Sequence, residues 1–373
     1  MAGLTPAVRV LVVNAGSSSL KLALLGEDDE QLWHRELEAP RARVADEEVA
    51  AALADLPAEP DAVGHRIVHG GERFREPVMI DRAVEGALQE LVALAPLHQP
   101  KSLAAVDAVT RALPSVPAVA CFDTAFHATL PPEAATYALP LEWRVRYGLR
   151  RFGFHGLSHA YAARAAGGAR RVVTCHLGAG ASLCAVLEGR SVDTTMGFTP
   201  LEGLVMATRA GSVDPGLLLW LQRCEGVSAD DMAEALEHES GLLGLAGTGD
   251  MRELLARDDE DARLALDVYV HRVRAGVGAM AASLGGLDAL VFTGGVGERS
   301  GRVRDLVCEG LSHLGVGSAD SGVDIELLTH HTPPRCSVSH QAWIWMKRRA
   351  SGGDTRPRRG RPALWSVERR SGG

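Results

Sequence analysis

The fold is decided by one stretch near the N-terminus, VRVLVVNAGSSSLKLALL, which spans residues 8–25. Val8 to Val13 predicts a buried strand and Leu20 to Leu25 predicts a second one, because short apolar runs bounded by turn residues are typical of core strands. Asn14 to Ser19, between the two runs, contains small and polar residues that predict a tight turn. The stretch therefore predicts a β-hairpin with a tip of small residues.

A second copy of this pattern occurs about half a chain later. Arg171 to Cys175 and Leu183 to Leu187 predict two strands, and His176 to Ser182 supplies the turn between them. Ser182 corresponds to Ser19 in this match. A repeat of such long period indicates a duplicated fold, in which each half contributes one hairpin to a shared cleft. The alternative is that any two hairpins rich in Gly and Ser look alike.

Helical and strand patterns alternate through the rest of the body. We expect helices over Asp81 to Ala95, from the capping residue Ser228 onward, over Glu260 to Leu284 and from near Ser300, with a strand over Leu287 to Thr293. This alternation predicts the α/β class.

The composition suits a two-domain enzyme. A chain of 373 residues with 46% hydrophobic residues is too long for one compact core and has enough apolar side chains for two. We expect domains over residues 1–127 and 128–340. Residues 341–373 form an Arg- and Gly-rich tail that we expect to be disordered.

Charge and cysteine usage exclude several classes of protein. The formal net charge of −8 argues against a nucleic-acid-binding surface on the body of the protein. The six cysteines form no C-x-x-C pair and no cluster, so reduced thiols are expected rather than a zinc site or disulfides. No segment approaches a membrane-spanning length or has the pattern of a signal peptide. We therefore expect a cytoplasmic protein with no nucleic-acid or membrane partner.

Three segments have the composition of phosphate-binding turns: Asn14 to Ser19, Gly178 to Ser182 and Gly294 to Gly297. Small residues let backbone N–H groups converge on an anion, and serine hydroxyls add further donors. None of the three is a Walker A loop or a dinucleotide-binding fingerprint.

Histidine, arginine and aspartate gather in four short strings that do not follow amphipathic spacing. A single such residue would be read as a surface residue or a satisfied core residue. Taken together they predict a phosphoryl-transfer site, which needs cationic donors around the transferred group and a carboxylate for Mg²⁺. The strings are residues 64–71, 122–127, 152–159 and 207–212.

At this point the sequence resembles the acetate kinase family, from near the N-terminus to about residue 325. The family's motifs occur in order and at similar spacing: NAGSSSLK, HRIVHGG, APLHQP, FDTAFH, FGFHGLSH, TCHLGAGAS, TMGFTPLEGL, TRAGSVDP and FTGGVGERS. The resemblance implies the duplicated actin-like (ribonuclease H-like) fold, a homodimer, and Mg²⁺-dependent transfer from ATP to acetate that gives acetyl phosphate and ADP. It also implies an acyl and dimer side in the first domain and a nucleotide side in the second.

The resemblance also implies roles for single residues. Asn14 corresponds to the residue near the metal and the phosphoryl group, and Arg66 and Arg209 to the pair that grips the acyl carboxylate and phosphoryl oxygens. His155 corresponds to a donor to the phosphoryl group, Asp123 to the Mg²⁺-associated carboxylate, and His98 to a supporting imidazole. The nucleotide is expected to contact Ser17, Ser18, Ser19, Lys21, His176, Gly178, Gly180, Ser182, Gly294, Gly295, Gly297 and Glu298.

Three departures from the family pattern affect this interpretation. Ala179 and Arg299 stand where the family commonly has Asn. No acidic residue occurs from Leu327 to Gly353, where the family has a Glu that helps to ligate Mg²⁺. The alternatives are therefore a kinase acting on propionate, butyrate or another short acid, and a weakly active homologue that binds nucleotide. A basic tail that binds nucleic acid is a weaker reading, because it has no motif.

The tail from near His340 has the Arg, Gly and Pro bias of a GC-rich gene read out of frame, and a genuinely divergent tail is the alternative. We expect resequencing of the gene to find an insertion or deletion near this codon. An intact reading frame would contradict the idea.

Overall fold

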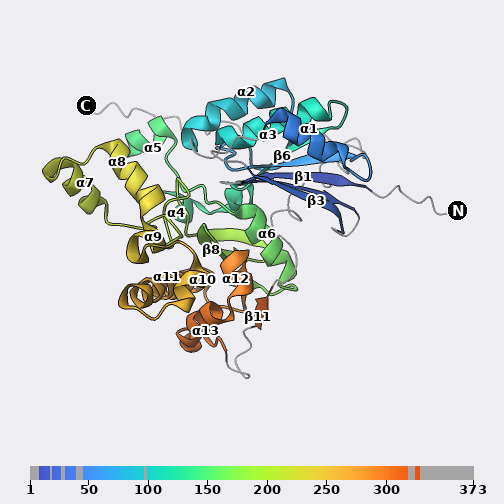
Figure 1. Cartoon of the computed structure of the whole chain (residues 1–373). Coiled ribbons are helices and arrows are strands. Elements are labelled where there is room, and N and C mark those ends of the chain that lie inside the picture. Colours follow the sequence, from blue (N-terminus) through green and yellow to red (C-terminus); the bar gives the residue numbers. More distant parts are fainter. Residues whose placement is uncertain are drawn as a thin grey trace, which may run out of the picture.

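The computed structural model describes residues 8–16, 19–26, 30–38, 45–95 and 99–317, and the backbone of 324–327. Ser17, Ser18, His98 and the tail lie outside these ranges, so the expectations for them stay predictions. Two mixed sheets organise the described residues, one above the other in Figure 1.

The first sheet has the strand order β3-β2-β1-β4-β6-β5. Strands β1, β2 and β3 are antiparallel neighbours, β4 and β6 continue the sheet parallel to β1, and β5 pairs antiparallel with β6. The strand bounds are β1 Val10–Ala15, β2 Ser19–Leu25, β3 Gln31–Glu38, β4 Ala62–Ile67, β5 Val78–Met79 and β6 Ala118–Phe122.

The second sheet repeats this connectivity, with the order β11-β10-β7-β8-β9. Again a three-stranded antiparallel unit, β7-β8-β9, is extended by two parallel strands, β10 and β11. The bounds are β7 Arg171–Leu177, β8 Ala181–Leu187, β9 Arg190–Thr194, β10 Ala289–Thr293 and β11 Asp324–Leu327. The duplicated α/β fold predicted from the two hairpins is therefore confirmed.

Helices cover the outer face of each sheet. On the first sheet, α1 (Asp46–Ala54) and α3 (Gln99–Ala112) pack against Leu11 and Val13 of β1. On the second, α11 (Glu260–Leu284) packs Tyr269, Val273 and Val277 against β7. The bounds of α11 agree with the prediction because both of its ends are capped, by Asp259 at the start and by left-handed Gly285 at the end.

The remaining elements are short. They are α2 Arg82–Glu90, the 3₁₀ turns Leu91–Leu94, Ala125–Thr129 and Ser312–Leu314, α4 Pro132–Ala135, α5 Leu141–Tyr147, α7 Pro215–Cys224, α8 Ala229–Glu234, the π-helical turn Ala235–Glu239, α9 Gly241–Ala246, α10 Met251–Ala256, α12 Gly294–Arg299 and α13 Gly301–Glu309. Asp81, Ser228 and Ser300 cap α2, α8 and α13, as their positions in the sequence predicted. None of the helices in the described ranges is long and apolar enough to cross a membrane.

One expectation needs correction. The sequence predicts a phosphate-binding turn at Gly294 to Gly297, before a helix near Ser300, but these residues already open the short helix α12. Gly294 makes the turn from β10 with a φ of +82°, and its N–H donates to the Glu298 carboxylate at 3.1 Å. The carboxylate thus satisfies a backbone donor at the start of the helix, a local effect that composition alone did not reveal.

Helix α6 (Gly156–Ala165) lies between the two sheets (Figure 1). Its Leu157 packs with Val12 and Cys121 of the first sheet. Its Ala162 packs with Val172 of the second sheet. One helix therefore brings residues from both halves to a common layer.

Four buried histidines should make the fold sensitive to acid. Burial lowers the pKa of His65 to about 3 and of His69, His127 and His176 to about 4. The unfolded chain therefore binds protons that the folded chain does not. Stability is complete above about pH 6.5 and is lost as the pH falls through about 4.

Urea unfolding should thus give a lower free energy of unfolding at about pH 5 than at about pH 7. His65→Leu should weaken this dependence, because neither ring nitrogen of His65 has a hydrogen-bond partner among the described residues. His271→Gln, at an exposed site on α11, should not. Equal stability of the parent chain at both pH values would contradict the prediction.

Candidate active site

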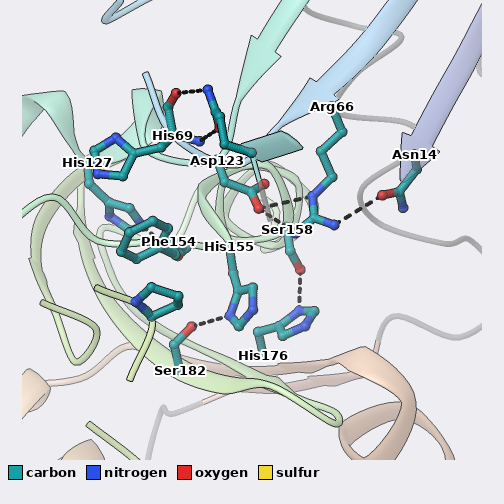
Figure 2. Close-up of polar contacts among 12 residues, drawn as sticks. Asn14, Arg66, His69, Asp123, His127, Phe154, His155, Ser158, His176 and Ser182 are labelled. Carbon is teal, nitrogen blue, oxygen red and sulfur yellow. Dashed lines mark hydrogen bonds and ion pairs between the residues drawn. The ribbon is translucent and has the colours of Figure 1, made fainter. Parts of the chain in front are cut away.

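The ends of three neighbouring strands place Asn14, Arg66 and Asp123 on one face of the first sheet. The register fixes this, because Val12 pairs with Gly64 and Cys121 with Arg66, so side chains two residues apart share the face. The Nε and Nη2 groups of Arg66 donate to Asp123 Oδ2 at 3.0 and 2.6 Å, and Nη1 donates to Asn14 Oδ1 at 3.1 Å (Figure 2).

This ion pair is largely removed from water. The Asp123 side chain is 3% exposed and the Arg66 side chain 20%. Burial alone would lower the pKa of Arg66, but the charge and hydrogen bonds of Asp123 raise it above its ordinary value. Arg66 is therefore a fixed cation, and removing either partner would leave a buried charge at a cost of about 3–5 kcal/mol.

His155 reaches the same place from the start of α6. It has a left-handed backbone with φ 55°, which costs a non-glycine residue on the order of 1 kcal/mol and is typical of functional sites. The next residue, Gly156, donates its N–H to the backbone oxygen of Asp123 at 2.8 Å. A side chain on Gly156 would collide with that oxygen, so glycine is required.

Polar side chains of α6, β7 and β8 surround His155. Its Nδ1 lies 2.8 Å from Ser182 Oγ on β8, and its ring centroid lies 4.3 Å from that of His176 on β7. The Nδ1 of His176 in turn lies 2.8 Å from Ser158 Oγ on α6 (Figure 2). Burial lowers the pKa of His155 well below its ordinary value, and the neighbouring His176, His159, Arg66 and Arg209 lower it further. The imidazole is therefore neutral and lies beside two permanent cations.

Arg209 comes from a loop of the second half. Its Nη1 donates to the backbone oxygen of Pro200 at 3.3 Å. The loop is held by the π-helical turn, because the N–H of Ala210 donates to the oxygen of Leu236 at 3.1 Å. Burial lowers the pKa of Arg209, while the charge of Glu237 opposes this shift.

The second glycine turn packs against this cluster. A Cβ on Gly180 would lie 3.2 Å from Cε1 and Nε2 of His155 and 3.8 Å from Nη1 of Arg209. A Cβ on Gly178 would lie 3.8 Å from the N–H nitrogen of Gly295, whereas one on Gly295 would meet no atom within 4 Å. The turn after β7 and the start of α12 therefore adjoin, with open space beside Gly295.

The structure brings most, but not all, of the predicted residues together. The following residues gather around the start of α6: Asn14, Arg66, Asp123, His155, His176, Ser182, Arg209, Gly178, Gly180 and Gly295. A Cβ on Gly294 or Gly297 would instead meet Leu177 of β7. Ser19 and Lys21 instead contact Glu36 of β3, by a hydrogen bond of 2.7 Å and an ion pair of 3.5 Å. The carboxylate of Glu298 is used within its own turn by Thr293 and Gly294.

Sequence reasoning did not single out Ser158, His159 and Thr174. Ser158 contacts His176, and His159 contacts both Ser182 and Thr174. A signal was present in the string that contains His155. His159 lies one helical turn after His155, so both face the same side of α6, and Thr174 lies two residues before His176 on the same face of β7.

The donor set fits Mg²⁺ and phosphate. Asn14 and Asp123 offer the amide and carboxylate oxygens that Mg²⁺ prefers, and both hydrogen bonds to Asp123 end on Oδ2. Arg66, Arg209 and the backbone N–H groups of the glycine turns are suited to phosphate oxygens. No group of three or more His, Cys, Asp and Glu side chains forms a metal site in the described part of the chain.

Comparison with known proteins decides the family. The model of the acetokinase family matches residues 34–344. The chain belongs to the acetokinase family. The match extends past residue 325, where the motif resemblance was expected to end, and this member, like its relatives, is a phosphotransferase.

Similar proteins match nearly the whole length of the chain. An acetate kinase of Protochlamydia amoebophila is 40% identical over 91% of this chain and 97% of its own length. The crystal structure of Porphyromonas gingivalis acetate kinase is 34% identical, with a TM-score of 0.81 over 90% of this chain and 99% of that one. A Francisella tularensis propionate kinase is 32% identical, also with a TM-score of 0.81, over 90% of this chain and 98% of that one. A ROK family protein of Streptococcus pneumoniae, 11% identical with a TM-score of 0.50 over 92% of this chain and 100% of that one, shares the fold alone.

The close packing of Gly180 generates a prediction for this family member. In Gly180→Ala, the new methyl group should displace His155 by a few tenths of an ångström and lower kcat roughly tenfold, since small misplacements of catalytic groups are costly. The urea midpoint should change little. Gly278→Ala is the matched control, because a Cβ there on α11 meets nothing within 4 Å. An unchanged kcat in Gly180→Ala would show that His155 does not need this packing.

Proposed function

We propose that this chain transfers the γ-phosphoryl group of ATP reversibly to acetate, giving acetyl phosphate and ADP. One observation carries the proposal: cations from both halves of the duplicated fold converge on His155. Arg66 comes from the first sheet and Arg209 from a loop of the second half, and both lower the pKa of His155. Family membership supports the same reaction.

The attack needs no general base. A carboxylate is ionised at neutral pH, so its oxygen can attack the γ-phosphorus directly. The transition state spreads charge over the equatorial oxygens of the transferred group. Arg66 and Arg209 neutralise that charge, and His155 donates a hydrogen bond to it. The glycine turns at Gly178–Gly180 and Gly294–Gly295 bind the rest of the nucleotide through backbone groups.

Asn14 and Asp123 would hold or orient Mg²⁺. When bound, Mg²⁺ neutralises the β- and γ-phosphate oxygens of the nucleotide. Asp123 is pre-oriented for this task, because both hydrogen bonds from Arg66 end on its Oδ2. Arg66 therefore does not occupy Oδ1.

Assembly and compartment form part of the proposal. We propose that residues 1–127 and 128–340 form the two domains. The resemblance implied a dimer side in the first domain, but the exposed apolar side chains of α5 and α7 lie in the second, and we propose that a second copy of this chain covers them. These side chains are 46–75% exposed: Leu141, Trp143, Val145, Tyr147, Leu217, Leu219 and Trp220. The five cysteines in the described ranges are free thiols, which suits the cytoplasm.

A hydroxamate assay with purified chain, ATP, Mg²⁺ and a series of short acids tests the function. Turnover that is highest with acetate supports the proposal. Higher turnover with propionate or butyrate would indicate that the chain is a kinase of one of these acids. The propionate kinase that it resembles is an example of this type. Nucleotide binding without turnover would indicate a weakly active homologue. The lack of acidic residues from Leu327 to Gly353 would explain this result, because the family has a Mg²⁺-ligating Glu there. A graft of an acidic family turn and helix after Ile325 should then restore Mg²⁺-dependent turnover.

Arg209 provides the sharpest mutational prediction. Arg209→Ala should lower kcat by a factor on the order of hundreds, because a cation that acts on the transition state is lost. Folding, measured by urea unfolding, should be nearly unaffected. Arg82→Ala, at an exposed position on α2, is the control and should retain full activity. A variant of Arg209 that keeps most of the parent turnover would remove this residue from the site.

A further inference from the structure

A chain of hydrogen bonds runs from His155 into the core of the second half. Nδ1 of His155 lies 2.8 Å from Ser182 Oγ, and the same hydroxyl lies 2.8 Å from Nε2 of His159. Nδ1 of His159 lies 2.7 Å from Thr174 Oγ1, which lies 3.4 Å from the backbone oxygen of Cys184. Ser182, His159 and Thr174 are completely buried, so the chain is closed to bulk water.

The Ser182 hydroxyl links the tautomers of the two histidines. A hydroxyl has one hydrogen, so it can donate to only one of the two imidazole nitrogens that it contacts. The other nitrogen must then carry a hydrogen and donate to Ser182 Oγ. Because a neutral imidazole carries one N–H, the choice at His155 determines the choice at His159.

Two arrangements satisfy the hydrogen bonds between the imidazoles and the hydroxyls. In the first, both imidazoles carry hydrogen on Nδ1, His155 donates to Ser182, Ser182 donates to His159, His159 donates to Thr174, and Thr174 donates to the oxygen of Cys184. In the second, His159 donates to Ser182, Ser182 donates to His155 and Thr174 donates to His159. Both imidazoles then carry hydrogen on Nε2, and the oxygen of Cys184 receives no hydrogen bond from Thr174. Only the first uses the oxygen of Cys184, so the chain without ligand favours it.

The two arrangements present opposite chemistry to the site. The Nε2 edge of His155 faces Gly180 and the side of Arg209. In the first arrangement this nitrogen is a bare acceptor, and in the second it is a donor. Phosphoryl oxygens only accept hydrogen bonds, so they are stabilised by the second arrangement alone, as long as the imidazole is neutral. The strongly lowered pKa of His155 agrees with a neutral ring.

We propose that Ser182, His159 and Thr174 set the tautomer of His155, and that a bound phosphoryl group shifts all four side chains together into the second arrangement. This proposal rests on the proposed function. In the shift one hydrogen moves from His155 to Ser182, one from Ser182 to His159 and one from His159 to Thr174. Thr174 gives up the hydrogen that it had donated to Cys184, and His155 takes one hydrogen from solvent on Nε2, so the shift requires no net proton uptake. The bound group selects between two populations that already contain the same number of protons. His159 and Thr174 are thus positioning residues, which act on the substrate only through His155.

Nitrogen NMR of the full chain tests the proposal. In protein with ¹⁵N-labelled histidine, long-range ¹H–¹⁵N spectra show which ring nitrogen carries hydrogen, and the variants His155→Asn and His159→Asn assign the signals. We expect hydrogen on Nδ1 of both rings in the free chain. With Mg²⁺ and the non-hydrolysable analogue AMPPNP, we expect hydrogen on Nε2 of both. The decisive signal is His159, which is completely buried and is linked to His155 through Ser182 Oγ.

A matched pair of hydroxyl deletions separates the linkage from general effects. In Ser182→Ala, the response of His159 to AMPPNP should be lost, and kcat should fall roughly tenfold with little change in the KM for ATP. Ser158→Ala deletes the same group beside His176 and should leave the response of His159 intact.

Three results would overturn the proposal. They are a doubly protonated His155 in the complex, an unchanged His159 in the complex, and a Ser182→Ala variant in which His159 still responds. Failure to bind AMPPNP would instead overturn the proposed function, and the shift with it, whereas binding without a change at His159 would overturn the tautomer linkage alone.

Discussion

The candidate site depends on the buried ion pair between Arg66 and Asp123. The guanidinium of Arg66 ties together the ends of β1, β4 and β6 through Asn14 and Asp123, and it is mostly buried. A buried cation is tolerated only when it is paired and hydrogen-bonded, so the strand register and the carboxylate must both be in place. The same pairing keeps Arg66 charged and leaves Asp123 oriented toward the cluster.

The second half of the fold is built around this fixed charge. Gly156 binds the backbone of Asp123, which sets the start of α6 and the left-handed conformation of His155. Since α6 packs on both sheets, it transmits the position of the first sheet to His176 and Ser182 on the second. Duplication alone would give two similar hairpins. The shared helix turns them into one site.

Much of this arrangement could be predicted from the sequence, because its causes are local. The strands of both hairpins follow from apolar runs on either side of small residues, and α11 from its caps at Asp259 and Gly285. Arg66, Asp123 and His155 occur in short strings that do not follow amphipathic spacing, which is why the sequence predicts a functional site there. Contacts between distant segments could not be predicted: Ser19 and Lys21 contact Glu36 on the next strand, and His159 on α6 contacts Ser182 on β8. The helix α12 was missed because a carboxylate four residues ahead, on Glu298, stabilises its first turn.

The central claim is that the carboxylate attacks phosphorus directly, with His155 as a hydrogen-bond donor and not as a nucleophile. A phosphorylated histidine would require two displacements at phosphorus, and direct attack requires one. The stereochemical course of the reaction separates these routes. With ATP whose γ-phosphoryl group is made chiral by oxygen isotopes, the account predicts acetyl phosphate of inverted configuration at phosphorus. Retention of configuration would show an even number of transfers and contradict the account.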